Sequence, residues 1–286
     1  GKRATILFDG AMSHANVYIN GQKVGYWPYG YNSFHFDITK YLKPGEKNTL
    51  AVRLENLPES SRWYPGAGLY RNVHLIITED AYIPVWGTYI TTPSVNEKFA
   101  KVNVRTKVVL PEGADPAKYS VETSVWNPNK QKLTAVRTSL EQMKYNNNEA
   151  EQEFVIQAPS LWSPEMPALY SAETRLYEGD KLKDIYTTPF GIRSIEIIPD
   201  KGFFLNGKRT VFKGVCNHHD LGPLGAAVND AAIRRQIRIL KDMGCNAIRT
   251  SHNMPAPELI RACDEMGMMI MAESFDEWNV AKCKNG

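Results

Sequence analysis

Short runs in which apolar and polar residues alternate dominate the first 200 positions of the chain. The stretch 16–27 holds two such runs joined by Asn20-Gly21, a strong β-hairpin signal because both turn positions need a positive φ. Further runs predict strands at 49–55, 72–78, 101–110, 119–127, 133–143, 149–157 and 170–178. Many short strands separated by turn residues, without a helical period, are typical of a β-sandwich.

The segment 78–86 (TEDAYIPVW) separates two sets of predicted strands that differ in composition. Two consecutive sandwiches, over residues 1–80 and 81–196, therefore explain the pattern better than a single one. The first predicted strand follows Lys2 and Arg3 at the very start of the chain. The sequence thus starts abruptly, at the edge of a strand.

From residue 197 onward, strands alternate with helices. The sequence predicts a hairpin at 203–213 that turns at Asn206-Gly207, strands at 211–216, 246–250 and 268–272, and helices at 229–243 and 257–266. Asn229 is placed to cap the first helix and Gly244 to end it, while Pro257 opens and Gly267 closes the second. Such alternation indicates right-handed parallel β/α units.

The predicted parallel strands, such as 268–272 (MMIMA), are apolar without alternation, which predicts that both of their faces are buried. Two helices cannot cover both faces of three strands. We therefore interpret residues 197–286 as the first part of a (β/α)8 barrel and expect the chain to stop inside it. A small three-stranded layer docked on the sandwiches remains the alternative. The predicted fold class is multidomain, with β-sandwiches followed by an α/β segment.

Composition and charge disfavour several function classes. Hydrophobic residues make up 43% and charged residues 23% of the chain, as in ordinary globular proteins. The 34 Lys and Arg nearly balance the 31 Asp and Glu and are scattered, which disfavours nucleic-acid binding. The longest apolar stretch, 266–272, is far shorter than the ~18 residues of a membrane span, and no signal peptide is visible. The cysteines form no CxxC pair or zinc-ligand spacing, so we expect buried or incidental thiols.

Polar residues gather where each of the three parallel strands ends. The first strand leads into 217–220 (NHHD), the second ends in 249–253 (RTSHN), and the third leads into 273–278 (ESFDEW). The carboxyl ends of parallel barrel strands lie on one rim, where barrel active sites form. We therefore predict a polar-ligand site on this rim. Solvated loops with helix N-caps, for which Asp220 and Asn253 are ordinary residues, remain the alternative.

The residue types at this rim favour a sugar ligand. The imidazoles of His218 and His252 can hydrogen-bond vicinal hydroxyls, and Arg249 can hold a carboxylate ionised. The nearby Phe275 and Trp278 offer apolar faces to a sugar ring.

Two other chemistries are less favoured at this rim. A metal bound by His218, His219 and Asp220 is disfavoured because adjacent residues of an extended chain point to opposite faces. Glu273 paired with Asp276 or Glu277 is a poor catalytic couple. The two carboxyls of a retaining glycosidase lie about 5–5.5 Å apart, on either side of the scissile bond and usually on separate strands. The role of Glu273 at the rim stays open.

Four stretches of the sequence form a set with a fixed order. They are 62–73 (RWYPGAGLYRNV), 161–170 (LWSPEMPALY) followed by FGIR at 190–193, 212–225 (FKGVCNHHDLGPLG), and 246–257 (NAIRTSHNMPAP) followed by MAESFD at 271–276. In this order, over nearly the whole chain, they resemble glycoside hydrolase family 2, especially its β-galactosidases. The resemblance implies a jelly-roll sugar-binding domain over 1–80, an immunoglobulin-like β-sandwich over 81–196 and the N-terminal part of a TIM barrel over 197–286. It also implies that N-terminal strands of the jelly roll are missing from this sequence, which agrees with the abrupt start.

The resemblance also implies a retaining mechanism with two glutamates. In this family the acid/base follows an Asn at the end of barrel strand four, and the nucleophile lies at strand seven. Neither strand is among the predicted elements. We therefore assign no catalytic residue in this chain and expect both glutamates beyond Gly286.

Binding residues carry over position by position. Arg249 resembles the arginine that holds the nucleophile carboxylate, His252 the histidine that contacts the glycone hydroxyls, and His218 the sugar-contacting histidine after strand one. The loop around Ser61 to Trp63 matches the jelly-roll loop that the family sends to the barrel mouth. The full predicted substrate-binding set is Arg62, Trp63, His218, His219, Asp220, Arg249, His252, Asn253, Glu273 and Asp276.

The sequence departs from the best-known bacterial β-galactosidases in two places. They carry an aspartate before the tryptophan region and a Glu-x-His metal pair after strand three, whereas this chain has Ser61-Arg62 and Glu277-Trp278-Asn279. No metal ligand or cofactor is therefore assigned here, although the resemblance leaves room for a magnesium or sodium ion in the complete enzyme.

We therefore hypothesise that this chain is part of a retaining β-glycosidase that hydrolyses terminal β-galactosides. The isolated chain is expected to be inactive, because the catalytic glutamates are absent from it. The alternatives are a β-glucuronidase or β-mannosidase of the same family, or a non-catalytic carbohydrate-binding or scaffold protein. The expected partners are a carbohydrate substrate and, in the complete protein, further copies in a homo-oligomer; nucleic acid and membrane are not expected. The compartment stays open among cytoplasm, periplasm and secretion.

Overall fold

The computed structural model describes residues 1–142, 149–277 and 279–285. Two compact units account for the chain: residues 2–77 together with 212–286, and residues 78–211 with Gly1. The predicted domain boundaries after residues 80 and 196 stay predictions, and the units divide at 77/78 and 211/212. Met143, the predicted end of one strand, and Trp278 lie outside the described residues.

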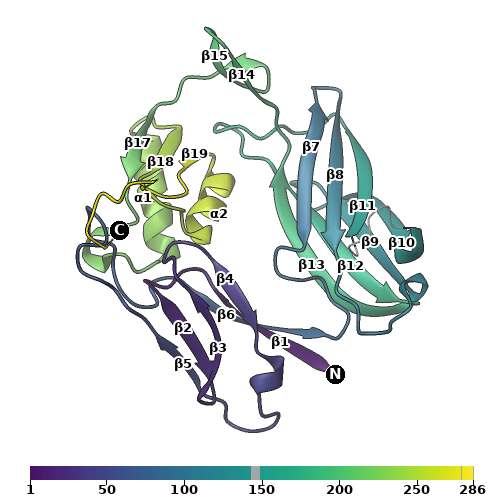
Figure 1. The fold of residues 1–286 in the computed structure, drawn as a ribbon. Coiled ribbons are helices and arrows are strands. Elements are labelled where there is room, and N and C mark those ends of the chain that lie inside the picture. Colours follow the sequence, from purple (N-terminus) through teal and green to yellow (C-terminus); the bar gives the residue numbers. More distant parts are fainter. Residues whose placement is uncertain (143–148, 278, 286) are drawn as a thin grey trace. The chain divides into compact units, whose positions relative to one another are not determined.

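The first sandwich consists of two three-stranded sheets (Figure 1). One sheet has the order β4 (Phe34–Asp37), β1 (Lys2–Phe8), β6 (Val73–Glu79), and the other has the order β3 (Gln22–Trp27), β2 (Ala15–Ile19), β5 (Leu50–Arg53). The predicted hairpin is confirmed, since β2 and β3 join at Asn20 and Gly21 with φ of 51° and 80°. Alternate residues of β1 and β2, such as Phe8 and Val17, are buried between the sheets.

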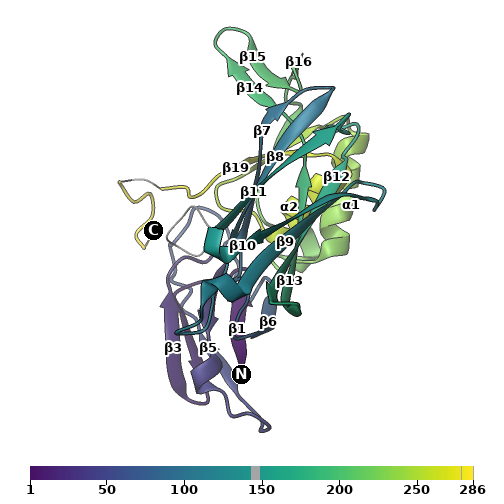
Figure 2. The same cartoon turned by 90° about the vertical axis from the view of Figure 1, so that its right-hand side faces the viewer.

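In the described part of residues 78–211, seven strands form a sandwich of two sheets (Figure 2). One sheet has the order β10 (Lys132–Ser139), β9 (Tyr119–Trp126), β12 (Leu169–Glu178), β13 (Lys181–Gly191). The other has the order β11 (Glu149–Gln157), β8 (Phe99–Lys107), β7 (Thr88–Val95). Inward-facing residues such as Val104 and Leu176 are fully buried. A small third sheet contains β14 (Ile195–Ile198), β15 (Gly202–Leu205) and β16 (Lys208–Arg209), with the predicted turn at Asn206-Gly207.

The C-terminal segment contains three parallel strands and two helices (Figure 1). In chain order they are β17 (Gly214–Asn217), α1 (Asp230–Asp242), β18 (Ala247–Thr250), α2 (Pro257–Met266) and β19 (Met269–Ala272). The predicted caps are present: the side chain of Asn229 accepts a hydrogen bond from the backbone N–H of Ala232, and Gly267 ends α2 with φ of 74°. The predicted fold class, β-sandwiches followed by parallel β/α units, is confirmed.

In the described residues the parallel sheet is covered on one face only, as expected if two helices cannot cover both faces of three strands. Val215, Ile248 and Ile270 share a row across the strands and pack with the apolar face of α1. The next row, Cys216, Arg249 and Met271, points to the other face, and Met271 is 55% exposed. Right-handed crossovers place successive helices on the same side of a sheet, so the opposite face stays uncovered.

Among the helices in the described part of the chain, none combines the length and the apolar character needed to cross a lipid bilayer.

Candidate functional site

Three side chains meet at the carboxyl ends of β18 and β19. Nε of Arg249 donates a hydrogen bond to Oε1 of Glu273, and Nδ1 of His252 lies 2.9 Å from Oε2 of the same carboxylate. The backbone N–H of Glu273 donates to Oγ1 of Thr250 over 3.1 Å, which ties the two strand ends together. The sequence predicted these residues on one rim, and the structure brings Arg249, His252 and Glu273 into direct contact.

The Glu273 carboxylate determines which nitrogen of His252 carries a proton. An ionised carboxylate can only accept, so Nδ1 of His252 donates to it, and Nε2 of the neutral ring is left as an acceptor. Nη2 of Arg249 lies 3.4 Å from the same Nδ1. Because both nitrogens carry hydrogen, neither can accept, and this contact is not a hydrogen bond. Burial by itself raises the pKa of Glu273, but the hydrogen bonds from His252 and then Arg249 outweigh it and hold the pKa below its ordinary value.

A tryptophan from the first sandwich completes an aromatic cluster at this edge. The ring centroid of Trp63 lies 5.3 Å from that of His218 and 5.6 Å from that of His252, and the two imidazoles are 5.6 Å apart. Nε1 of Trp63 donates to the Tyr31 hydroxyl over 3.1 Å. Residues 57–67, which carry Trp63, thus reach the carboxyl end of the parallel sheet.

Arg62 and Asp276 join the same loop to the segment after β19. Nη2 and Nε of Arg62 donate to the two carboxylate oxygens of Asp276 over 2.7 and 3.2 Å, and Nζ of Lys282 donates to Oδ1 over 3.0 Å. Burial raises the pKa of Asp276, and the hydrogen bonds from Lys282 and Arg62 more than reverse this, so its pKa lies below the ordinary value. Two cations share one carboxylate here.

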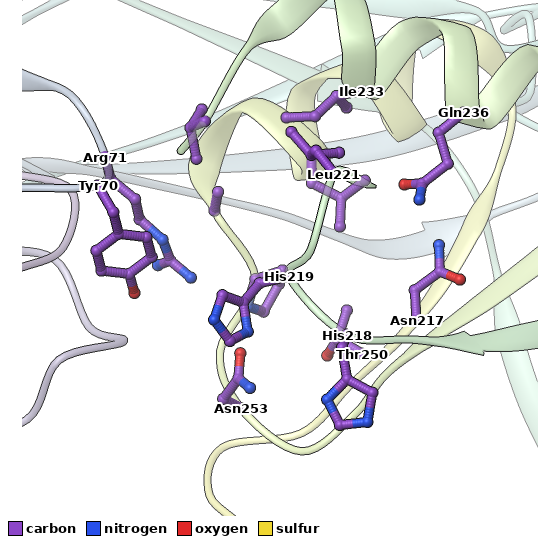
Figure 3. A pocket seen from close by; sticks show the side chains of 14 residues that line it. Tyr70, Arg71, Asn217, His218, His219, Leu221, Ile233, Gln236, Thr250 and Asn253 are labelled. Atoms are coloured by element: carbon purple, nitrogen blue, oxygen red, sulfur yellow. The ribbon is translucent and has the colours of Figure 1, made fainter. Parts of the chain in front are cut away.

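Two other predicted residues, His219 and Asp220, have different partners, and His219 lines the pocket shown in Figure 3. His219 turns toward the first sandwich, with Nε2 2.8 Å from the carbonyl oxygen of Pro65 and its ring centroid 5.1 Å from that of Tyr31. Burial lowers the pKa of His219. Asp220 accepts from the backbone N–H of Gly222 over 2.6 Å and so supports a turn.

Asn253 is 2% exposed and lines the pocket of Figure 3 beside His218, His219 and Arg71. A second pocket is lined by Trp63 and His252 together with Tyr29, Tyr31, Ser60, Ser61, Phe275, Asp276 and Glu277. Trp278, proposed from the sequence as an aromatic sugar contact, lies outside the described residues. The assignment of all these residues to substrate binding stays a prediction.

Several residues that organise this region were missed by sequence reasoning. Arg71 and Asn72 end the loop that carries Trp63, and both contact the barrel segment: Arg71 through the carbonyl of Met254, Asn72 through Glu258. Both lie inside the stretch 62–73 that carries the resemblance, but nothing in the linear pattern distinguishes a buried arginine from a surface one.

Within the described residues, no three His, Cys, Asp or Glu side chains are grouped closely enough to hold a metal ion.

Three domain families of glycosyl hydrolases family 2 match successive parts of the chain. Residues 1–79 match the sugar binding domain of glycosyl hydrolases family 2, residues 82–193 match the family domain described as glycosyl hydrolases family 2, and residues 196–284 match its TIM barrel domain.

Individual relatives carry two different activities in their names. Beta-galactosidase BoGH2A of Bacteroides ovatus is 45% identical over 99% of this chain and 33% of its own length. A putative beta-glucuronidase of Formosa agariphila is 39% identical over 97% of this chain and 26% of its own length. The crystal structure of a beta-glycosidase from Bacteroides vulgatus superposes with a TM-score of 0.92 at 35% identity, over 99% of this chain and 36% of that one. The chain thus spans about a third of the length of the proteins it matches.

The order of three matched domains, the parallel strands with His218, Arg249 and His252 at their carboxyl ends, and the agreement with solved structures lead to one conclusion. This chain belongs to glycosyl hydrolases family 2 and comprises its sugar-binding domain, its immunoglobulin-like sandwich and the start of its TIM barrel.

Proposed function

We propose that this chain is the N-terminal part of a retaining β-glycosidase that hydrolyses terminal β-galactosides, and that it supplies the glycone-binding side of the active site. The observation that carries the proposal is the carboxylate of Glu273 held between Arg249 and His252, with Trp63 packed on the same histidine. This arrangement presents imidazole, guanidinium and indole groups at the edge where barrel enzymes bind substrate.

Each of these groups has a role in the proposed reaction. With Nδ1 donating to Glu273, Nε2 of His252 accepts a hydrogen bond from a glycone hydroxyl, and His218 contacts a second hydroxyl. Arg249 faces the uncovered side of the parallel sheet, which is the interior of a closed barrel, and there it orients the nucleophile carboxylate. The nucleophile and the acid/base are two glutamates of later barrel strands, so that chemistry occurs only in the complete enzyme.

A neutral glycone agrees best with the charges at this edge. A glucuronide carries a carboxylate, which calls for a cation that is not already neutralised. Here Arg62 and Lys282 both contact Asp276, and Arg249 contacts Glu273. The Arg62–Asp276 pair is bidentate, which fixes that guanidinium in place. Arg62 and Lys282 are therefore committed to a carboxylate of the protein, which supports a galactoside over a glucuronide.

The test uses the complete gene product that contains this chain and a panel of aryl β-glycosides: galactoside, glucuronide, mannoside and glucoside. We expect the highest kcat/KM on the galactoside. Preference for the glucuronide would overturn the galactoside assignment and leave a glycosidase. Folded protein that binds galactose without hydrolysing any member of the panel would favour a carbohydrate-binding protein instead.

The same panel applied to the 286-residue chain alone separates binding from catalysis. We expect no turnover, because both catalytic glutamates are assigned to later strands. Turnover that disappears in the variant Glu273→Gln would place a catalytic carboxylate in this chain and contradict the proposed division of roles.

A further inference from the structure

The buried side chain of Arg71 connects the sugar-binding domain and the barrel segment through hydrogen bonds. Nη1 of Arg71 donates to the carbonyl oxygens of Tyr31 and Asp9 over 2.7 and 3.3 Å, and Nη2 donates to the carbonyl oxygen of Met254 over 2.8 Å. Only 4% of Arg71 is exposed. A guanidinium is suited to this position because its N–H groups point in fixed, divergent directions.

Two of the three carbonyls that Arg71 contacts, those of Tyr31 and Met254, belong to segments that bear on the candidate site. Tyr31 accepts the indole N–H of Trp63, and Met254 lies two residues after His252 in the loop that leaves β18. Figure 3 shows Arg71 on one side of the pocket, facing His219 and Asn253. One side chain therefore contacts the loop of His252 and also Tyr31, the residue whose hydroxyl accepts a hydrogen bond from Trp63.

Neighbouring residues of the first sandwich pack closely against the Arg71 side chain. A Cβ atom added at Gly10 would lie 2.8 Å from Cδ of Arg71 and 3.0 Å from the carbonyl oxygen of Gly30, so glycine leaves room for the guanidinium stem at this position. The neighbouring Asn72 donates through Nδ2 to Oε1 of Glu258, a carboxylate in the first turn of α2 that is 4% exposed. Two successive residues of the first sandwich thus hold the beginning of α2 and the loop before it.

We propose that Arg71 is a positioning residue for glycoside hydrolysis, which holds the His252 loop of the barrel in register with the Trp63 loop of the sugar-binding domain. This inference rests on the proposed function, since it assumes that His252 and Trp63 contact the glycone. It assigns to the first domain a role in the geometry of the active site, through a residue that does not touch the substrate.

The substitution Arg71→Met removes the donors and leaves the three carbonyls without them, while Arg71→Lys keeps the charge and one donor group. In the complete enzyme we expect kcat/KM on the aryl β-galactoside to fall about 10–100-fold for Arg71→Met, the loss associated with misplacing a group by about 1 Å. Arg71→Lys is expected to lie between this variant and the wild type. Arg53→Met is the matched control: it removes an exposed arginine of the same domain, and its kcat/KM should not change.

A double-mutant cycle with His252→Ala separates positioning from a general loss of structure. If Arg71 acts through His252, the double variant Arg71→Met/His252→Ala should lose no more activity than His252→Ala alone. Losses that multiply would overturn the proposal. Should Arg71→Met fail to fold, the same cycle is run with Arg71→Lys.

A second measurement tests Arg71 without reference to any substrate. Hydrogen–deuterium exchange of the complete protein should be faster in Arg71→Met within residues 251–258, and unchanged in β9 and β12 of the second sandwich. Unchanged exchange in 251–258 would overturn the inference. If the wild type hydrolyses no glycoside, the proposed function fails, and the exchange experiment still decides whether Arg71 holds the His252 loop.

Discussion

Nδ1 of His252 lies 2.9 Å from Oε2 of Glu273, and the other oxygen of that carboxylate accepts a hydrogen bond from Arg249. Glu273 thus orients two side chains that the sequence assigned separately to the sugar and to the nucleophile. Its position between two donors is that of an orienting group, because both carboxylate oxygens are already occupied.

The substitution Glu273→Gln tests this orienting role in the complete enzyme. The amide keeps the shape of the side chain but loses the negative charge, so the contacts with Arg249 and His252 weaken. We expect kcat/KM on the aryl β-galactoside to fall about 10–100-fold with residual turnover. Glu153→Gln, an exposed glutamate of the second sandwich, serves as the control. Complete loss of turnover would place Glu273 among the reacting groups.

The lowered pKa of Glu273 predicts a specific dependence of stability on pH. The pKa in the folded protein lies below the unfolded value of about 4.3, so the ionised carboxylate stabilises the fold above that value. This contribution is lost as the pH falls through the folded pKa. We expect wild type to melt above Glu273→Gln at pH 7 and at pH 5, and the difference to shrink as the pH falls through the lowered pKa of Glu273. A difference in melting temperature that is constant with pH would contradict this assignment.

Replacement of Arg62 by Met should loosen the loop that carries Trp63. The Arg62 side chain is 49% exposed, so its ion pair with Asp276 is worth at most about 1 kcal/mol of stability. We expect a small change in the unfolding midpoint, which disappears at about 1 M salt because screening weakens the pair in the wild type. In the complete enzyme, KM for the galactoside should rise while kcat changes less. An unchanged KM would show that Arg62 does not hold Trp63 in place.

The N-cap of α1 offers a test of stability that is independent of the site. Asn229 accepts a hydrogen bond from the backbone N–H of Ala232 over 3.0 Å, and Asn229→Ala leaves that donor without its partner. We expect a loss of about 0.5–2 kcal/mol in the free energy of unfolding. Asn229→Asp keeps an acceptor at the same place and adds a favourable charge at the helix N-terminus, so it should retain wild-type stability. Equal losses in both variants would contradict the capping role.

Local signals predicted much of the secondary structure. The turn at Asn20-Gly21 and both caps of the C-terminal helices act within a few residues, so the sequence alone was sufficient to locate them. The strand β4 (Phe34–Asp37) was not predicted, because its four residues are too few to show a period and its pairing with β1 is long-range. An apolar run cannot show which face of the parallel sheet the helices will cover, and the structure decided that it is the face of Val215, Ile248 and Ile270.

In the candidate site, too, the sequence predicted some features and missed others. Chain order alone placed Arg249, His252 and Glu273 at the ends of neighbouring parallel strands, because such strands all end at one edge of a sheet. His219, by contrast, was grouped with His218, although the structure turns it toward Pro65 and Tyr31 of the first sandwich. The direction of a side chain depends on which surface packs against it, and adjacent residues report nothing about that surface.

The sequence by itself determined the family, the alternation of strands and helices in the C-terminal segment, and the edge at which the polar residues gather, because all of these follow from local patterns and from motifs in a fixed order. Only the tertiary structure decided that Trp63 meets His218 and His252, and that Arg71 joins the first sandwich to the carbonyl of Met254. These contacts join residues more than 150 positions apart, and their geometry is set when two packed surfaces come together, an event that no local pattern encodes.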